Sequence, residues 1–511
     1  MSALSIMITE YLSGLRPLYF AKQCLVIFCI FLLGALLADL LLRDEESWVR
    51  RSILAFPLGI SAFVITAYAM LVAGIPYNTA TVIAAFVIEA VAAVFLNRKS
   101  FVALDIKKSG KYVLIAAGVA VITAAVSCSG LVPVSITNDT LYYFKRYPDS
   151  IVFFGGLRDQ FDCWLTDTGL GIVCVDTLPP LFGFGETFGI REFFHIDFVA
   201  FFAMCIYERA SKNLEKKGAI VATVLITGVL ATATPFVILG HWGLANMYFM
   251  EMFFIAAYTS VDVEDSIGAK SVLLLALSLL RIEGTLFAVW LVLCICAYRK
   301  IGKKLALFVV LPMTVLFGTY CLRVFTQFNL QDNIYLFLTP KKAILLVGVI
   351  AATGIYISFI EPVLPEGIHR YLPCIYIIGA LCGNLLMLVR DSGLYLGNLR
   401  TFYANLFGQS GWGIMPHFAI AMFVLLIAEY LIRFRKNKTT PGTSDRFNMT
   451  VVAGFILIAI AASYGRGDAL SGYVGDSGNR VLLQVVPLVV LMYAELTLGL
   501  LNSRKTESIQ R

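Results

Sequence analysis

Long apolar stretches, separated by short polar ones, repeat along almost the whole chain. A helix needs about 20 predominantly apolar residues to cross the hydrocarbon core of a bilayer. The stretches that fit a membrane helix are 24–42, 52–75, 79–96, 112–134, 194–208, 219–240, 246–260, 305–321, 343–360, 372–389, 416–433, 449–465 and 481–501. The pattern predicts an all-α polytopic membrane protein with about 13 transmembrane helices.

A further apolar stretch, 271–298, is interrupted by Arg281-Ile282-Glu283-Gly284. Charged residues are costly at membrane depth, and glycine weakens a helix interior. We therefore expect a broken, re-entrant pair of short helices here, which enters the membrane and returns to the same side.

The positive charges predict the orientation. Lys and Arg are concentrated in the connections 97–111, 209–218, 299–304 and 433–446. All four fall on one side of the membrane if the spans alternate and 271–298 is a hairpin. The positive-inside rule makes that side cytoplasmic. We expect a multi-pass protein of the plasma (inner) membrane, with its N-terminus outside and its C-terminus in the cytoplasm.

This topology divides the chain into four parts. Residues 1–134 form an N-terminal four-helix membrane segment, and 135–193 form an extracytoplasmic loop. Residues 194–501 form the remaining helix bundle, and 502–511 a cytoplasmic tail. The loop mixes aromatic residues with turn residues and lacks low-complexity sequence, so we expect it to be folded.

Composition narrows the function classes. Only 14% of the residues are charged and 59% are hydrophobic, whereas a soluble domain carries about 25% charged residues. The net charge of +7 resides in the short connections, which leaves no basic face for nucleic acid. The chain has no phosphate-binding Gly-Lys-Ser/Thr loop and no Gly-x-Ser-x-Gly motif, which argues against nucleotide-driven pumping and serine hydrolysis. Its four His include no ligand-spaced pair, which argues against a zinc site.

The first candidate for chemistry is the segment containing Asn138, Asp139 and Tyr142, just beyond the span 112–134. A carboxylate at the membrane surface can accept a proton from a hydroxyl or bind a divalent cation. The alternative is a helix N-cap, in which Asn or Asp satisfies free backbone amides.

The second candidate is the pair Arg281 and Glu283. Ionisable groups at membrane depth often mark functional sites. The alternative is a pair that closes the hairpin and caps its two helices.

The third candidate is Arg480, which follows a Gly-rich segment at the outer start of the last span. A guanidinium there can bind a lipid phosphate, or it can anchor the helix at the interface. His241, at an outer helix end, joins the candidate substrate-binding residues, although a lone His there is usually a satisfied polar group.

The order of these features resembles the GT-C superfamily of membrane glycosyltransferases, which take a sugar from a polyprenyl-phosphate carrier on the outer side of the membrane. The Asn138-Asp139 segment is similar to the acidic outer loop of that family. Arg281, Glu283 and Gly284 resemble its Arg-x-Glu-Gly turn, and Arg480 is similar in placement to its late phosphate-binding Arg. The resemblance covers roughly 112–501 by layout, in an uncharacterised bacterial branch.

The resemblance implies a GT-C-like fold and sugar transfer with inversion, in which Asp139 and Glu283 are catalytic. Arg281, Arg480, Asn138, Tyr142 and His241 would bind substrate. The partners would be a polyprenyl-phosphate-linked sugar, an envelope glycan, lipid or protein acceptor, and membrane lipids. The resemblance implies no definite cofactor. Whether the reaction needs a divalent cation stays open, because the motif lacks the second acidic residue of the family.

Three other classes remain. A membrane scaffold without chemistry would have no outer cavity, and the depth of Arg281 and Glu283 speaks against it. A lipid-linked polysaccharide polymerase or ligase would place its large outer loop late and load it with Arg, whereas the large loop here is early and Arg-poor. A transporter or flippase would show broken helices in corresponding places of two halves, whereas only one broken stretch is evident.

Overall fold

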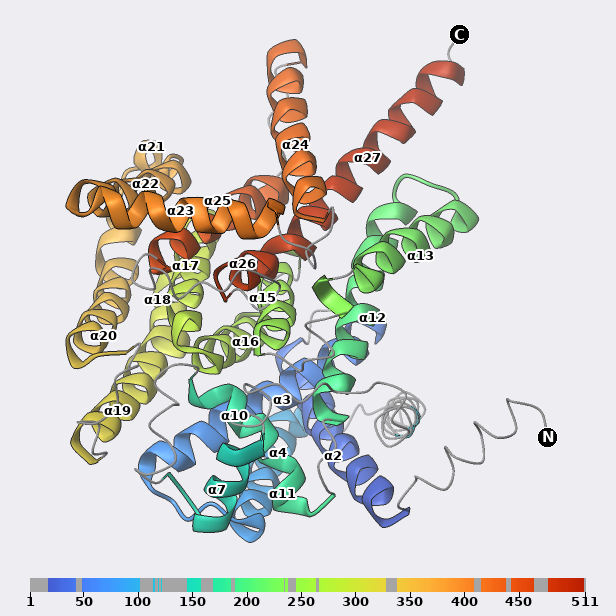
Figure 1. Cartoon of the computed structure of the whole chain (residues 1–511). Coiled ribbons are helices and arrows are strands. Elements are labelled where there is room, and N and C mark those ends of the chain that lie inside the picture. The colour runs from blue at the N-terminus through green and yellow to red at the C-terminus, as the bar shows by residue number, and fades with distance from the viewer. Residues whose placement is uncertain are drawn as a thin grey trace.

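The computed structural model describes residues 17–42, 48–101, 114, 118, 121, 145–157, 169–184, 189–233, 235–237, 245–262, 266–327, 338–408, 415–437, 443–463 and 477–509. All regular structure in these ranges is helical, as the sequence predicts (Figure 1).

The first half of the described chain contains α2 (Pro17–Leu41), α3 (Trp48–Ala73), α4 (Thr79–Phe101), α7 (Tyr147–Phe154), α10 (Leu170–Asp176), α11 (Leu178–Phe182), α12 (Gly189–Ser211), α13 (Lys216–Thr232) and α15 (Ala245–Asp262). The centre contains α16 (Ile267–Leu280), α17 (Ile282–Arg299), α18 (Gly302–Leu305), the π-helix η2 (Ala306–Val310), α19 (Leu311–Gln327), α20 (Pro340–Ile355), the π-helix η3 (Tyr356–Ile360) and the 3-10 helix η4 (Glu361–Val363). The last part contains α21 (Glu366–His369), α22 (Leu372–Arg390), α23 (Ser392–Gly408), α24 (Met415–Asn437), α25 (Thr443–Ser463), α26 (Ser477–Leu482), the 3-10 helix η6 (Leu483–Val485) and α27 (Val486–Ile509).

Nine stretches of helix within the described ranges are long and apolar enough to cross a membrane. They are Leu18–Leu41, Val49–Ala73, Thr79–Asn97, Ile282–Arg299, Gly302–Thr326, Pro340–Val363, Leu372–Arg390, Thr443–Ala462 and Arg480–Leu498. The chain is therefore a multi-pass, all-helical membrane protein.

The expected number of spans, about 13, is higher than this count. The expected spans 194–208, 219–240, 246–260 and 416–433 coincide with α12, α13, α15 and α24, which are helical but too polar or too short to qualify. The expected span 112–134 lies outside the described ranges, apart from single residues. Conversely, α17 is long enough to cross by itself, although it belongs to the stretch that the sequence marks as broken.

Helices α2 and α3 pack along each other through two glycines. A Cβ on Gly34 would lie 1.6 Å from the carbonyl oxygen of Ala55, and one on Gly59 would lie 2.1 Å from that of Ile30. Backbones can approach this closely only where side chains are absent, as is common between membrane helices.

Helix α16 lies at the centre of the bundle and is almost entirely buried. It contacts α3, α10, α15, α17 and α19. Figure 1 shows α15, α16 and α17 in the middle of the molecule. The N-terminal helices, together with α7, α10 and α11, lie below them, and the helices α22 to α27 lie above them. Any group at the end of α16 is therefore positioned by several elements.

Residues next to all four Lys/Arg-rich connections lie at one end of the bundle, which we call the basic end. Glu208, near the C-terminus of α12, accepts hydrogen bonds from Arg50 and from Tyr258 of α15. Arg299, at the end of α17, donates to the carbonyl oxygen of Val261, at the end of α15.

The two other basic connections lead to the same end. Thr450, near the start of α25, shares a hydrogen bond with Tyr298 of α17. Asn97, near the end of α4, donates to Leu36 of α2, and Leu41 at the end of that helix lies against Gly268 at the start of α16. This arrangement agrees with the alternation of spans that the sequence predicts.

The described part of the expected outer loop is folded at the opposite end. Tyr77, between α3 and α4, hydrogen-bonds Thr177 between α10 and α11 at 2.7 Å. Helix α10 is buried throughout and packs against α3 and α16. A Cβ on Gly171 would lie 2.3 Å from the carbonyl oxygen of Leu279, so α10 sits backbone to backbone on the end of α16.

The π-helix η2 continues directly into α19, which ends beside α3. There Arg323 donates to the carbonyl oxygens of Leu71 and Val72. These contacts tie the end of α19 to the same end of the bundle as α10 and α11.

Candidate functional site at the α16–α17 break

Arg281 forms the whole connection between α16 and α17. Its backbone is extended, with φ −139° and ψ 157°. The two helices pack against each other on either side of it, as the expected hairpin requires. A Cβ on Gly284 would lie 2.7 Å from the carbonyl oxygen of Leu277 and 2.8 Å from the ring of Phe249. Glycine at this position therefore permits the tight reversal of the chain.

Glu283 and Asn246 hold the guanidinium of Arg281. Its Nε and Nη2 lie 2.6 and 2.5 Å from Oε1 of Glu283, and both side chains are about nine-tenths buried. Nη1 makes a longer contact, 3.5 Å, with Oδ1 of Asn246 at the start of α15. We call these three residues the arginine site.

Gly169, which precedes α10, closes one side of the arginine site. Its φ of +97° is a conformation that other residues rarely adopt, and a Cβ there would lie 2.8 Å from Cα of Arg281. The folded part of the outer loop thus rests directly on the helix break.

The arginine site has unused hydrogen-bonding capacity in the described structure. A guanidinium carries five N–H donors in a planar fork. The contacts with Glu283 and Asn246 occupy one donor on each of the three nitrogens, which leaves one on Nη1 and one on Nη2. Guanidinium donors are well suited to the oxygens of a phosphate or carboxylate. The described contacts therefore leave two donors of Arg281 beyond the pair with Glu283.

A second polar cluster lies between α12 and α15. Nδ1 of His195 is 2.5 Å from Oε1 of Glu251, which is 2% exposed. Asp197 is also buried, and its Oδ2 has no hydrogen-bond partner in the described structure. We call these three residues the carboxylate cluster. Glu251 and Asn246 are five residues apart on α15, so they point to different faces of that helix.

The expected site residues are only partly within the described ranges. Asn138, Asp139, Tyr142 and His241 lie outside them. Arg480 lies in α26 and is partly buried. The helix η6, which follows α26, packs against α15, the helix that carries Asn246. The structure thus pairs Arg281 with Glu283 at the hairpin break, which is the structural alternative that the sequence left open, and adds Asn246 to the pair.

No group of three or more His, Cys, Asp or Glu within the described ranges has a geometry that could hold a metal ion. The expectation of a divalent cation beside Asp139 concerns residues outside those ranges.

Sequence reasoning missed Asn246, Asp197 and Glu251. The two acids interrupt the apolar stretches 194–208 and 246–260. The cost of charge at membrane depth, which pointed to Arg281 and Glu283, applies equally to them. Asn246 gives no such signal, because an amide at a helix start is common. His195, like His241 a lone His at an expected outer helix end, is paired with the buried Glu251.

No protein-family model matches the chain, and no curated protein or solved structure shows significant similarity to it. The function must therefore be argued from the sites themselves.

Proposed function

We propose that the protein is a membrane glycosyltransferase of the GT-C type, which moves a sugar from a polyprenyl-phosphate carrier to an extracytoplasmic acceptor with inversion. The observation that supports this proposal most is the arginine site. A buried guanidinium with two unused donors lies at a helix break, at the end of the bundle away from the basic connections. In the expected topology, that end faces the outer leaflet.

In the proposed reaction, Arg281 binds the phosphate that leaves with the carrier. As the bond between the anomeric carbon and the phosphate oxygen breaks, the phosphate takes the electron pair and gains negative charge. Donors that are already in place for that charge contribute on the order of 10²–10³-fold in rate. Glu283 and Asn246 orient the guanidinium, and Arg480 supplies a second cation.

Asp139 is the proposed general base. It accepts the proton of the acceptor hydroxyl while the hydroxyl oxygen attacks the anomeric carbon from the face opposite the phosphate. A positioned base contributes roughly 10²–10⁴-fold. Asn138, Tyr142 and His241 are the remaining proposed contacts to the substrate. The proposal also includes the expected topology, in which the chain crosses the membrane about 13 times and its N-terminus lies outside.

The carboxylate cluster favours a second candidate, a transporter or flippase. The cluster lies on two expected spans, 194–208 and 246–260, and buried acids beside a His in such spans are typical of ion and proton pathways. Such a protein would move a lipid-linked sugar between leaflets without forming a new glycosidic bond. Analysis of the product therefore separates the two candidates.

The test is sugar transfer by the full chain, reconstituted in liposomes with a radiolabelled polyprenyl-phosphate sugar and an envelope-glycan acceptor. We expect a labelled product, and we expect Asp139→Asn to lower its rate at least 100-fold. Asp149→Asn, which changes an acid of the same loop in α7, is the matched control and should retain the rate. Labelled carrier that only changes leaflet would refute the transferase and favour the transporter.

A further inference from the structure

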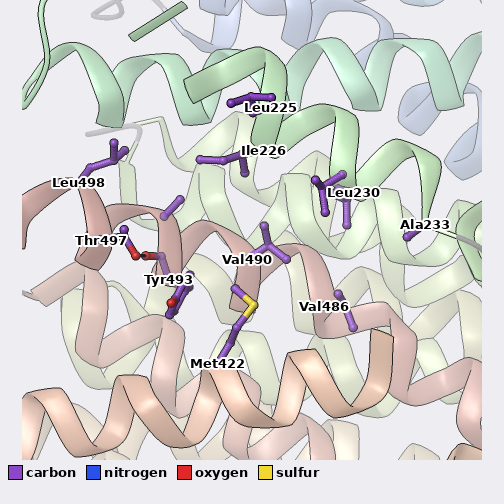
Figure 2. A pocket seen from close by; sticks show the side chains of 12 residues that line it. Leu225, Ile226, Leu230, Ala233, Met422, Val486, Val490, Tyr493, Thr497 and Leu498 are labelled. Atoms are coloured by element: carbon purple, nitrogen blue, oxygen red, sulfur yellow. Dashed lines mark hydrogen bonds between the residues drawn. The ribbon is translucent and has the colours of Figure 1, made fainter. Parts of the chain in front are cut away.

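An apolar groove lies between α13, α24 and α27, and none of the arginine-site residues lines it. Its volume is about 280 Å³. Figure 2 shows side chains of α13, such as Leu225 and Leu230, on one side and side chains of α27, such as Val490 and Leu498, on the other, with Met422 of α24 beside them. The groove exists because α13 and α27 each pack along α12 but scarcely contact each other.

The groove offers a ligand almost nothing to hydrogen-bond. Its lining is aliphatic apart from Tyr493 and Thr497, and the hydroxyl of Thr497 already donates to the carbonyl oxygen of Tyr493 at 2.8 Å. On the open side, the α13 residues Leu225 and Val229 are 63% and 64% exposed. A hydrocarbon chain entering from the bilayer matches this lining.

The length of the groove corresponds to one leaflet. Its lining residues on α27 extend from Val486 to Leu498, and twelve residues of helix rise about 18 Å. Half of a hydrocarbon core of ~30 Å is about 15 Å. One acyl chain of a phospholipid would therefore fit along it.

One end of the groove meets a group of free cations. Leu498 packs with Ala210 and Ala219, on the two sides of the α12–α13 connection. Lys212, Lys216 and Lys217 in this connection are exposed and make no hydrogen bond or ion pair in the described structure. Lysines at the interface attract anionic head groups. The groove is thus apolar along its length and positively charged at one end.

We propose that this groove binds one acyl chain of an anionic phospholipid, whose phosphate lies at Lys212, Lys216 and Lys217. Hydrocarbon length and charge complementarity both select this occupant. In the expected topology the lysines are cytoplasmic, so the lipid belongs to the inner leaflet. The inference does not depend on the proposed glycosyltransferase activity.

The test measures lipid binding to the purified full chain by native mass spectrometry, with phosphatidylglycerol and phosphatidylcholine of identical acyl chains. We expect phosphatidylglycerol to be retained preferentially. Val229→Trp, which fills the groove, should reduce its binding at least tenfold. Val224→Trp changes an equally exposed residue of α13 outside the lining, 66% against 64% exposed, and should leave binding unchanged.

The charges are tested separately. Lys216→Gln/Lys217→Gln should lower the affinity for phosphatidylglycerol by roughly fivefold per lysine. Lys303→Gln/Lys304→Gln changes an exposed lysine pair in another basic connection and should have no effect. Equal binding of the two lipids would overturn the proposal. So would an equal loss of phosphatidylglycerol binding in a variant and its control. A dimer that disappears in Val229→Trp would assign the groove to a second copy of the chain instead.

Discussion

Two buried acid–base pairs lie at opposite ends of the hairpin formed by α16 and α17. At the tip, Glu283 holds Arg281 at 2.5 and 2.6 Å. Near the base, Oε1 of Glu361 in η4 lies 2.6 Å from Nε2 of His369 in α21. A Cβ on Gly302, three residues after α17 ends, would lie 3.0 Å from the other carboxylate oxygen, so Glu361 packs directly against the connection after the hairpin.

The difference between the pairs lies in what each leaves unused. An imidazole has only two nitrogens, and one of them is engaged by Glu361. A guanidinium has five donors, and the pair with Glu283 and the contact with Asn246 leave two of them. The Glu361–His369 pair can thus hold η4 against α21, whereas Arg281 closes its own hairpin and keeps two donors beyond the pair. The two pairs therefore differ in spare donors and not in burial.

The largest effect is expected from removing the guanidinium. Arg281→Ala leaves Glu283 buried without its partner, which should cost about 3–5 kcal/mol in stability. The transfer rate should fall roughly 10²–10³-fold. Thermal unfolding and sugar transfer in liposomes measure the two effects. The double variant Arg281→Ala/Glu283→Ala should recover much of the stability but none of the rate. Recovery of both would make the arginine site purely structural.

A smaller effect is expected at the base of the hairpin. His369→Ala leaves Glu361 buried without a hydrogen bond, at a cost of about 1–3 kcal/mol. Transfer by the folded protein should stay within about twofold of the native rate, because no donor at the tip changes. Rates normalised to the folded fraction check this expectation. A loss as large as that of Arg281→Ala would remove the distinction between the two pairs.

The contact between the outer loop and the hairpin tip gives a third expectation. Gly169→Ala should lower stability by more than the ~1–2 kcal/mol of a left-handed helical residue, because φ +97° with ψ 151° is essentially restricted to glycine and because its Cβ would also meet Cα of Arg281. It should reduce transfer as well. Gly155→Ala also has a positive φ, but it is left-handed helical (φ +67°, ψ 28°) and has only a distant neighbour at 3.9 Å, so it should cost only the strain of that conformation and leave transfer intact. If the two variants lost the same stability and kept the same transfer rate, Gly169 would have no role in supporting the arginine site.

The smallest effect is expected at an exposed pair near the base. The hydrogen bond from Lys300, together with its charge, holds the pKa of Glu366 below its usual range. The pair therefore stabilises the fold above the ordinary glutamate pKa of about 4.3, and this contribution is lost as the pH falls through the lowered pKa. Glu366→Gln should lower the melting temperature slightly at neutral pH and not at all in acid. If the melting temperatures of the native protein and the variant differed by the same amount at every pH, the ion pair with Lys300 would not be the cause.

Sequence pattern alone identified the helical class, the hairpin break at Arg281 and the common end of the bundle for the four basic connections, because each depends on local hydrophobicity or charge. It did not reveal that α10 enters the bundle, since the apolar run Leu170–Phe182 is too short to stand out as a span. It also missed Asn246 as a partner of Arg281, which is 35 residues away in the chain. Such contacts depend on how helices pack, and hydropathy carries little information about packing.

The π-helix η2 has a consequence for insertions and deletions. A π-type turn accommodates one residue more than an α-helical turn. Because the wider turn absorbs that residue, deleting one residue from Ala306–Val310 would close an ordinary α-helical turn and leave α19 at nearly the same rotation about the helix axis. Arg323 would keep facing Leu71 and Val72, the carbonyls to which it is bonded. A deletion within α19 before Arg323 would instead rotate that side chain by about 100° away from α3, so the π-turn is a place where this helix tolerates the loss of a residue.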